Sequence, residues 1–263
     1  MQSASNPPVV LIIGGNDPSG GAGLAADIQA VSALGAHPAP VAAALTAQDT
    51  RDVSRVQALD PEFVSEQARC VLADMPVAAV KLGLLASADV GRAVAKLLRT
   101  HPGLPLVVDP VLRASGGTGL AEDALLQVYR EEIFPLAVLV TPNMAEMRRL
   151  APGASDARSG AQALLKLGAA HVLIKGADEA TADVHNLLFS ADGSHAESTW
   201  PRLAGVYHGS GCTLASAIAA LLAQGETPQA AVREAQRYTW ETLKRGWRLG
   251  RGQLIPDRQI PRG

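Results

Sequence analysis

The sequence has few aromatic side chains, and this scarcity narrows the kinds of core that it can form. Phe, Trp and Tyr make up 3% of the 263 residues, whereas apolar residues make up 48%. The core must therefore be aliphatic, as in proteins whose helices pack on a parallel sheet. At this length one domain buries roughly three quarters of the surface that its unfolded chain exposes, which excludes a disordered chain.

Cysteine, net charge and long apolar runs are scarce too, and each absence removes a class of protein. Two cysteines cannot form a disulfide framework, and the N-terminus lacks the pattern of a signal peptide, so we expect a cytoplasmic protein. The 23 basic and 25 acidic residues offer no attraction to nucleic acid or to a membrane surface. No apolar run approaches the roughly 20 residues of a membrane-spanning helix.

Short apolar runs alternate with helical patterns along most of the chain. The predicted strands are 9–13, 37–45, 78–82, 106–109, 138–141 and 172–175. Helical periodicity and short connections fill the intervals between them. This alternation predicts an α/β fold whose sheet is mostly parallel and carries helices on both faces.

The pattern changes near the C-terminal end. Two β-rich pieces around Ala191-Asp-Gly-Ser194 predict a hairpin at the sheet edge, and helices are predicted at 211–224 and 228–245. Residues 251–263 are polar and contain proline, so we expect them to lie over the surface or to be mobile. Without a repeat or a linker, residues 1–263 are predicted to form one domain, with a core at about 9–247 and a tail at 248–263.

Polar residues follow five predicted strands, at the edge where parallel sheets bind ligands. They are Asn16 and Asp17, Thr46 to Gln48, Asp109, Asn143 and Lys175. A single residue of this kind usually caps a helix, but five at one edge predict a ligand site. The loop Gly14–Gly23, which follows the first predicted strand, is rich in glycine, and this lets a ligand approach the backbone closely.

Two nucleotide-binding motifs fit this loop poorly. Gly21-Ala-Gly23-Leu-Ala-Ala26 matches the dinucleotide pattern Gly-x-Gly-x-x-Ala, but five loop residues separate it from the strand and no acidic residue stands about 20 positions on. The Gly-Lys-Ser/Thr of a P-loop is missing as well. Any nucleotide chemistry must therefore use a different phosphate cradle.

Asp27 shares a helical stripe with Leu24, Ile28 and Val31, so its carboxylate is predicted to face inward at a helix start. Two interpretations stay open: a group that serves the ligand site, or a buried carboxylate with satisfied hydrogen bonds. Cys70 lies on a helical face with Phe63 and is predicted to be a buried packing residue.

The motif His208–Thr213 comes directly before an apolar helix. Gly209, Ser210 and Gly211 would present backbone N–H groups at the helix N-terminus, which is a ready anion site. The same dipole favours a thiolate, so Cys212 is expected to lose its proton near neutral pH. Three roles stay open for Cys212: a small packing residue, a base in phosphoryl transfer, or the nucleophile of an acyl transfer.

Seven motifs together resemble the hydroxymethylpyrimidine/phosphomethylpyrimidine kinases of thiamine biosynthesis, in the ribokinase-like superfamily. They are Gly15–Gly23, Ala44–Thr50, Lys81–Leu84, Val108–Val111, Thr141–Glu146, Ile174–Gly176 and His208–Thr213. Each is modest evidence alone, but seven in this order are specific, and they cover about residues 9–225. The resemblance implies a ribokinase-like three-layer α/β/α fold with a mostly parallel central sheet and an edge hairpin.

The resemblance also implies roles for individual residues, with ATP and Mg²⁺ as cofactors. Together with Asp27, the residues expected around the pyrimidine are Gly15, Thr46, Gln48, Leu84 and Val111. The expected catalytic residues are Cys212 as base and Gly209, Ser210 and Gly211 as the anion hole for the γ-phosphate. The expected nucleotide contacts are Asn143, Lys175 and Thr213, and the expected Mg²⁺ ligands are Asp109 and Glu146. Residues Arg113–Gly119 would form a flap over the substrate.

We therefore predict a kinase that phosphorylates 4-amino-5-hydroxymethyl-2-methylpyrimidine and then its monophosphate, and the resemblance implies a homodimer. A pyridoxal kinase is the alternative, because a branch of that activity uses the same scaffold and a cysteine at the anion hole. The amide of Gln48 favours the aminopyrimidine. A non-catalytic sensor of the pyrimidine is a further alternative, although it would need neither a base nor a metal site. Lys175-Gly-Ala-Asp178 and residues 183–186 depart from the family pattern on the nucleotide side.

Overall fold

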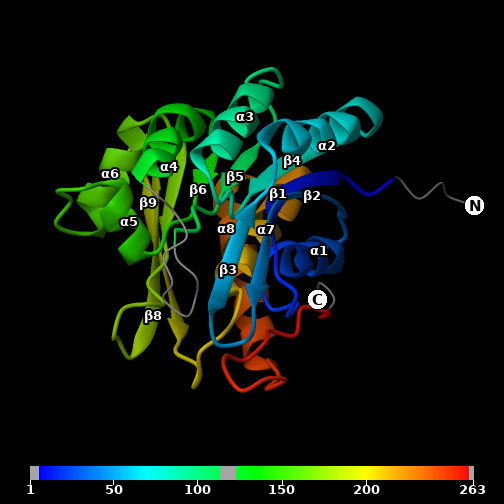
Figure 1. Ribbon diagram of the computed structural model, residues 1–263. Helices are drawn as coiled ribbons and strands as arrows, with labels where there is room; N and C mark the ends of the chain where they lie inside the picture. The colour runs from blue at the N-terminus through cyan, green and yellow to red at the C-terminus, as the bar shows by residue number, and fades with distance from the viewer. Residues whose placement is uncertain (1–5, 113–122, 261–263) are drawn as a thin grey trace, which may run out of the picture.

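Nine strands of the described residues, 6–112 and 123–260, form one sheet in the computed structural model (Figure 1). The strands are β1 (Val9–Asn16), β2 (His37–Gln48), β3 (Val53–Ala58), β4 (Val77–Leu82), β5 (Leu106–Val108), β6 (Leu139–Val140), β7 (His171–Ile174), β8 (Asp183–Ser190) and β9 (His195–Pro201). Their order across the sheet is β3-β2-β1-β4-β5-β6-β7-β8-β9.

The central strands are parallel and the edges are not. β2, β1, β4, β5, β6 and β7 pair in parallel, whereas β3 pairs antiparallel with β2 and the β8–β9 hairpin pairs antiparallel with β7. The predicted mostly parallel sheet and its edge hairpin are confirmed. The sequence did not predict β3, because Val53 is its single buried residue and it carries no apolar alternation.

The helices divide between the two faces of the sheet (Figure 1). They are α1 (Gly23–Ala33), α2 (Pro61–Asp74), α3 (Ala88–Leu98), α4 (Asp123–Val128), α5 (Met144–Leu150), α6 (Ala157–Lys166), α7 (Ser210–Ala223) and α8 (Pro228–Lys244). A turn of π-helix (Tyr129–Ile133) and a 3₁₀ turn (Phe134–Leu136) follow α4. Within the described chain, no helix is both long enough and apolar enough to span a membrane.

Alternate residues of β1 belong to two separate apolar clusters. Leu11 and Ile13 pack with α2 to α6, whereas Val10 and Ile12 pack with α1, α7 and α8. All four side chains are fully buried because a parallel strand between two helical layers has no solvent face. This arrangement is the predicted three-layer α/β/α fold.

One expectation about exposure is wrong, and a second is narrowed. Cys70 is exposed, because α2 packs on the sheet through Val64 and Ala68 while Cys70 and the 53% exposed Phe63 lie on its outer side. Of the two alternatives for the polar tail, residues 251–260 follow the first, because they lie against the body of the protein and are held there. Arg258 is only 1% exposed, and main-chain hydrogen bonds bind this segment to the residues around α8 and to the β2–β3 connection.

Truncating either face of β1 should destabilise the protein strongly. We expect Leu11→Ala and Ile12→Ala each to lower the free energy of unfolding by about 2–5 kcal/mol, because each leaves a cavity in a different layer. Lys96→Ala, at an exposed position of α3, is the control and should change it by less than about 0.5 kcal/mol. Urea titrations of the three variants check this, and a small loss at only one of the two β1 positions would contradict two buried faces.

Candidate active site

A cavity of about 400 Å³ opens where the parallel strands end. It is lined by the predicted site residues Gly15, Asp27, Thr46, Gln48, Leu84, Asp109, Val111, Asn143, Glu146, Lys175, Gly209, Ser210, Gly211 and Cys212. The carboxyl ends of β1, β4, β5, β6 and β7 meet here, as expected for a ligand site in a parallel sheet. The predicted flap Arg113–Gly119 lies outside the described residues.

Helix α7 starts at this cavity with bare backbone. Gly209 precedes it with φ +72°, and a Cβ there would lie 2.1 Å from the carbonyl oxygen of Gly21. A Cβ on Gly211 would lie 3.1 Å from Lys175 Nζ and 3.5 Å from Asp109 Oδ2. The first N–H groups of a helix have no partner within the helix, so this end can bind an anion.

Lys175 and Asp109 form an ion pair beside the start of α7. Lys175 Nζ donates to Asp109 Oδ1 at 2.8 Å, and the hydroxyl of Thr141 donates to the same oxygen at 3.2 Å. Burial alone would lower the pKa of Lys175, but Asp109 and Glu146 raise it above its ordinary value. Lys175 therefore stays positively charged next to the anion site.

Glu146 closes a capping box with Asn143 at the start of α5. The Asn143 N–H donates to Glu146 Oε2 and the Glu146 N–H donates to Asn143 Oδ1, each at 2.8 Å. Burial, reinforced by the charge of Asp109, raises the pKa of Glu146 to about 7. The capping box makes Asn143 a structural residue, and a role toward the nucleotide stays a prediction.

A divalent cation would fit the two carboxylates of Asp109 and Glu146. No group of three or more His, Cys, Asp and Glu side chains that could hold a metal ion occurs in the described part of the chain. Mg²⁺ often takes only one or two carboxylates together with phosphate oxygens and water. Burial raises the pKa of Glu146 and so disfavours its charged form, and a bound cation would favour that form instead.

Cys212 does not have the acidity that its place in the sequence predicted. Burial raises the pKa of the thiol to about 11, although the nearby Lys81 ammonium lowers it. The expectation of a thiolate near neutral pH is therefore wrong, because burial disfavours the charged form more than Lys81 favours it. At neutral pH the cavity contains a protonated thiol.

Asp27 lies beneath the cavity in a buried ion pair. Both of its oxygens accept from Lys81 Nζ at 2.8 Å, and Oδ1 also accepts from the Ser216 hydroxyl at 2.7 Å. Burial raises the pKa of Asp27, and Lys81 opposes that rise. These bonds match the second interpretation of the sequence, a buried carboxylate with satisfied hydrogen bonds, and a contact of Asp27 with the substrate stays a prediction.

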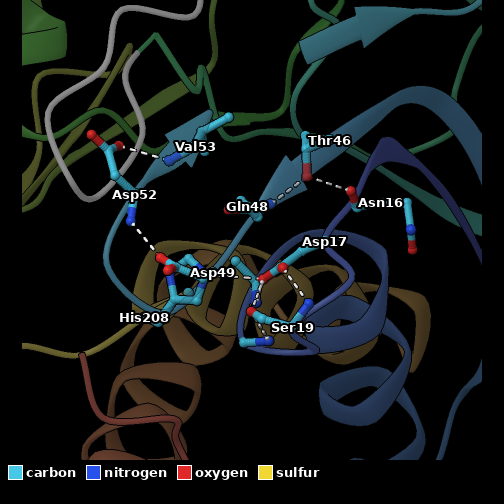
Figure 2. A network of polar contacts seen from close by, with 12 residues as sticks. Asn16, Asp17, Ser19, Thr46, Gln48, Asp49, Asp52, Val53 and His208 are labelled. Carbon is cyan, nitrogen blue, oxygen red and sulfur yellow. Dashed lines mark hydrogen bonds and ion pairs between the residues drawn. The ribbon is translucent and has the colours of Figure 1, made fainter. Parts of the chain in front are cut away.

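The orientation of the Gln48 amide is fixed by its neighbours (Figure 2). The Thr46 hydroxyl donates its proton to the Asn16 carbonyl at 2.8 Å, so its oxygen must accept from Gln48 Nε2 at 2.7 Å. No donor to Gln48 Oε1 is recorded among the residues described. One N–H and the carbonyl oxygen of this amide therefore remain for a ligand.

Asp17 ties the glycine-rich loop to the segment before α7 (Figure 2). Its carboxylate accepts from the N–H groups of Ser19 and Ala22 and lies 2.9 Å from His208 Nε2. Burial would raise the pKa of Asp17, but hydrogen bonds from His208 and Ser19 lower it below its ordinary value. A charged Asp17 therefore bridges the two loops that meet at Gly21 and Gly209.

Thr213 does not reach the cavity. Its hydroxyl donates to the Gly209 carbonyl at 2.8 Å and accepts from Arg258 Nε at 2.7 Å, and the side chain is fully buried. The predicted nucleotide contact of Thr213 is corrected. Its position on the inner side of α7 makes it a support for the loop before the helix.

A second cavity of about 310 Å³ adjoins the first. The two share Lys175, Ser210 and Gly211 in their walls. Trp200 and Trp240 line the far part of the second cavity, with ring centroids 6.1 Å apart. Two chambers thus meet at the start of α7.

Comparison with known proteins assigns the family. The family model described as phosphomethylpyrimidine kinase matches residues 17–257. The chain belongs to the phosphomethylpyrimidine kinase family. It is 41% identical to the hydroxymethylpyrimidine/phosphomethylpyrimidine kinase of Streptomyces coelicolor over 94% of this chain and 92% of that protein. The resemblance that the seven motifs carried is thereby confirmed.

Longer relatives and solved structures agree with this family. The thiamine biosynthesis bifunctional protein ThiED of Geobacter sulfurreducens is 41% identical over 92% of this chain, which spans about half the length of that and two other bifunctional relatives. A pyridoxal kinase from Staphylococcus aureus in complex with pyridoxal superposes with a TM-score of 0.88 and 26% identity, covering 97% of this chain and 94% of that one. A phosphomethylpyrimidine kinase from Clostridium difficile superposes with a TM-score of 0.77 and 30% identity, covering 89% of this chain and 98% of that one.

Several residues at or beside this kinase-family site could not be assigned a role from the sequence. Lys81 carried a usable signal, because a lysine inside an apolar strand must find a buried partner. His208 was part of a motif without an assigned function. Trp200, Trp240 and Arg258 gave no signal, because their contacts join segments that are distant in the sequence.

The Cys212 thiol should react as a group of high pKa. In a Cys70→Ser background, which leaves one thiol, we expect the iodoacetamide rate to rise about tenfold per pH unit between about pH 7 and 10, since only roughly 0.1% is thiolate at pH 8. Mass spectrometry of the alkylated protein measures the rate. A rate that levels off near neutral pH would mean an activated thiolate instead.

Proposed function

We propose that this chain is an ATP-dependent kinase that phosphorylates 4-amino-5-hydroxymethyl-2-methylpyrimidine and then its monophosphate. The observation that carries this proposal is the Gln48 amide, held in one orientation across a cavity that also contains the start of α7 and Cys212. Membership of the phosphomethylpyrimidine kinase family supports it.

The pyrimidine side of the cavity suits an aminopyrimidine. The free N–H of Gln48 can donate to a ring nitrogen while Oε1 accepts from the exocyclic amine. Leu84 and Val111 supply apolar walls for the ring. A Cβ at Gly15 would lie 2.9 Å from Leu84 Cδ2, so glycine there lets the Leu84 wall lie close to the backbone.

The nucleotide is proposed to occupy the second cavity, with its phosphates at the junction. Lys175 and the N–H groups from Gly209 to Gly211 would hold the transferred phosphoryl group, because both face the place where its charge develops. Asp109 and Glu146 would hold Mg²⁺, which supplies neutralising charge at the phosphates when it is bound.

In the first proposed transfer the substrate hydroxyl oxygen forms a bond to the γ-phosphorus of ATP, the bond from that phosphorus to the leaving ADP breaks, and the hydroxyl proton leaves; in the second transfer an oxygen of the monophosphate is the acceptor. Cys212 can accept that proton only as a thiolate. The high pKa makes this form scarce at neutral pH but strongly basic, which suits an alcohol. Most of the acceleration is then expected from positioning and charge, as is usual for phosphoryl transfer.

Pyridoxal is the second candidate substrate, because a structural relative that covers nearly the whole chain is a pyridoxal kinase in complex with pyridoxal. A non-catalytic sensor is a weaker candidate, since Cys212, Asp109, Glu146 and Lys175 would then serve no chemistry. The homodimer and the cytoplasmic location stay predictions.

Substrate preference tests the proposal directly. With ATP and Mg²⁺, we expect kcat/KM for the hydroxymethylpyrimidine to exceed that for pyridoxal at least about tenfold, with the monophosphate also accepted. Gln48→Ala should raise KM for the pyrimidine about tenfold with little change in kcat, because the lost contact is uniform binding. If kcat/KM of the wild type is clearly higher for pyridoxal, the protein is a pyridoxal kinase and the proposed substrate is wrong.

The role of Cys212 is tested separately. Cys212→Ala should lower kcat by about 100-fold while the Kd for the pyrimidine stays within about twofold. The rise of log kcat with pH above 7 that thiolate catalysis requires should disappear in the variant. Calorimetry and a pH series of initial rates measure both effects, and normal turnover by the variant would remove Cys212 as the base.

A further inference from the structure

The segment after α8 returns to the site and is held there by its backbone. The Trp247 and Ile255 main chains pair with each other, Asp257 N–H donates to the Thr242 carbonyl at 3.1 Å, and Tyr238 Oη donates to the Arg258 carbonyl at 2.8 Å. These contacts anchor the segment on α8. They bring the side chain of Arg258 under the start of α7.

The Arg258 guanidinium joins four segments of the chain. Nε donates to the Thr213 hydroxyl at 2.7 Å and Nη1 donates to Gln29 Oε1 at 3.4 Å. Nη2 donates to the carbonyls of Gly21 and of His208. The planar fork of arginine makes these contacts possible at fixed angles, whereas lysine offers a single point of charge.

These contacts fix consecutive peptide planes at the anion hole. Because a peptide unit is planar, holding the His208 carbonyl also sets the direction of the Gly209 N–H. Thr213 links Arg258 to the next peptide plane. Its hydroxyl accepts from Arg258 and donates to the Gly209 carbonyl, which sets the direction of the Ser210 N–H. Both N–H groups belong to residues that line the substrate cavity.

The buried charge of Arg258 has no carboxylate in contact. Among the ion pairs of the residues described, none includes Arg258, and its four partners are neutral oxygens. A Cβ on Gly209 would lie 2.9 Å from Nη2, so the cation lies directly behind the loop. Burying a cation costs free energy, and the charges of Asp17 and Asp27 stabilise this one without touching it; an anion bound at the start of α7 would add to their effect.

We infer that Arg258 is a positioning residue for phosphoryl transfer: its guanidinium aims the N–H groups of Gly209 and Ser210 at the transferred phosphoryl group and adds positive charge behind them. This inference rests on the proposed function for the identity of the reaction. Arg258 does not touch the substrate, and it acts through Thr213 and through the carbonyls of the two loops.

Arg258→Ala should lower kcat about 100-fold, because a small misplacement of the donors weakens stabilisation of the transition state. KM for the pyrimidine should stay within about twofold, since the Gln48 side of the cavity is untouched. Guanidinium at non-denaturing millimolar concentration should restore part of kcat, while equal sodium chloride should not. Arg251→Ala, which removes an exposed arginine from the same segment, is the matched control and should keep wild-type kcat.

A second variant and a second measurement keep the inference decidable. Arg258→Lys keeps the charge but loses the fork, so it should also lose kcat at least about tenfold; this variant decides the matter if Arg258→Ala does not fold. Calorimetry should show that Arg258→Ala raises the Kd for ATP at least about tenfold and leaves the Kd for adenosine unchanged.

The outcomes separate this inference from the proposed function. Wild-type kcat in both Arg258→Ala and Arg258→Lys would overturn the positioning role. So would a fall in kcat that comes with an equal rise in KM for the pyrimidine and is not rescued by guanidinium. If the wild type phosphorylates neither the pyrimidine nor pyridoxal, the proposed function is overturned. The Kd values of ATP and adenosine for the wild type and Arg258→Ala would still test whether Arg258 supports phosphate binding.

Discussion

The first turn of α7 reaches the cavity as bare backbone, and the architecture around it depends on that constraint. A helix leaves its first N–H groups without internal partners and carries a partial positive charge at this end. Gly209 and Gly211 keep side chains out of the way, and the close approach of Gly209 to Gly21 leaves no room for a Cβ. The requirements for an open anion site and for tight packing of two loops are therefore met by the same glycines.

Buried cations surround this helix start, and they are held by two kinds of partner. Lys81 lies in an ion pair with Asp27, and Lys175 with Asp109, whereas Arg258 donates to neutral oxygens. Removing such a charge from water costs several kcal/mol unless partners compensate, so each cation has a fixed place. Fixed charges are well suited to stabilise a transferred phosphoryl group, because they need no reorganisation during the reaction.

Much of this could be predicted because the signals are local. Apolar runs such as 9–13 must be buried strands, and polar residues directly after them must meet at one edge when the strands are parallel. The residues predicted around the cavity do line it, apart from Thr213, whose side chain points away from it. β3 escaped prediction because an edge strand with one buried residue has no apolar period.

The layered α/β fold, the family and the set of residues at the strand ends follow from the order of residues along the chain, because periodicity and motif order are properties of neighbouring residues. The charge and the partners of individual groups depend instead on how distant segments pack. The helix dipole alone predicts an acidic Cys212, but burial raises its pKa to about 11. Asp27 forms an ion pair with Lys81, and Arg258 supports the start of α7 from a C-terminal segment that carried no site motif. Desolvation and long-range pairing depend on which surfaces meet, and no local pattern in the chain encodes that.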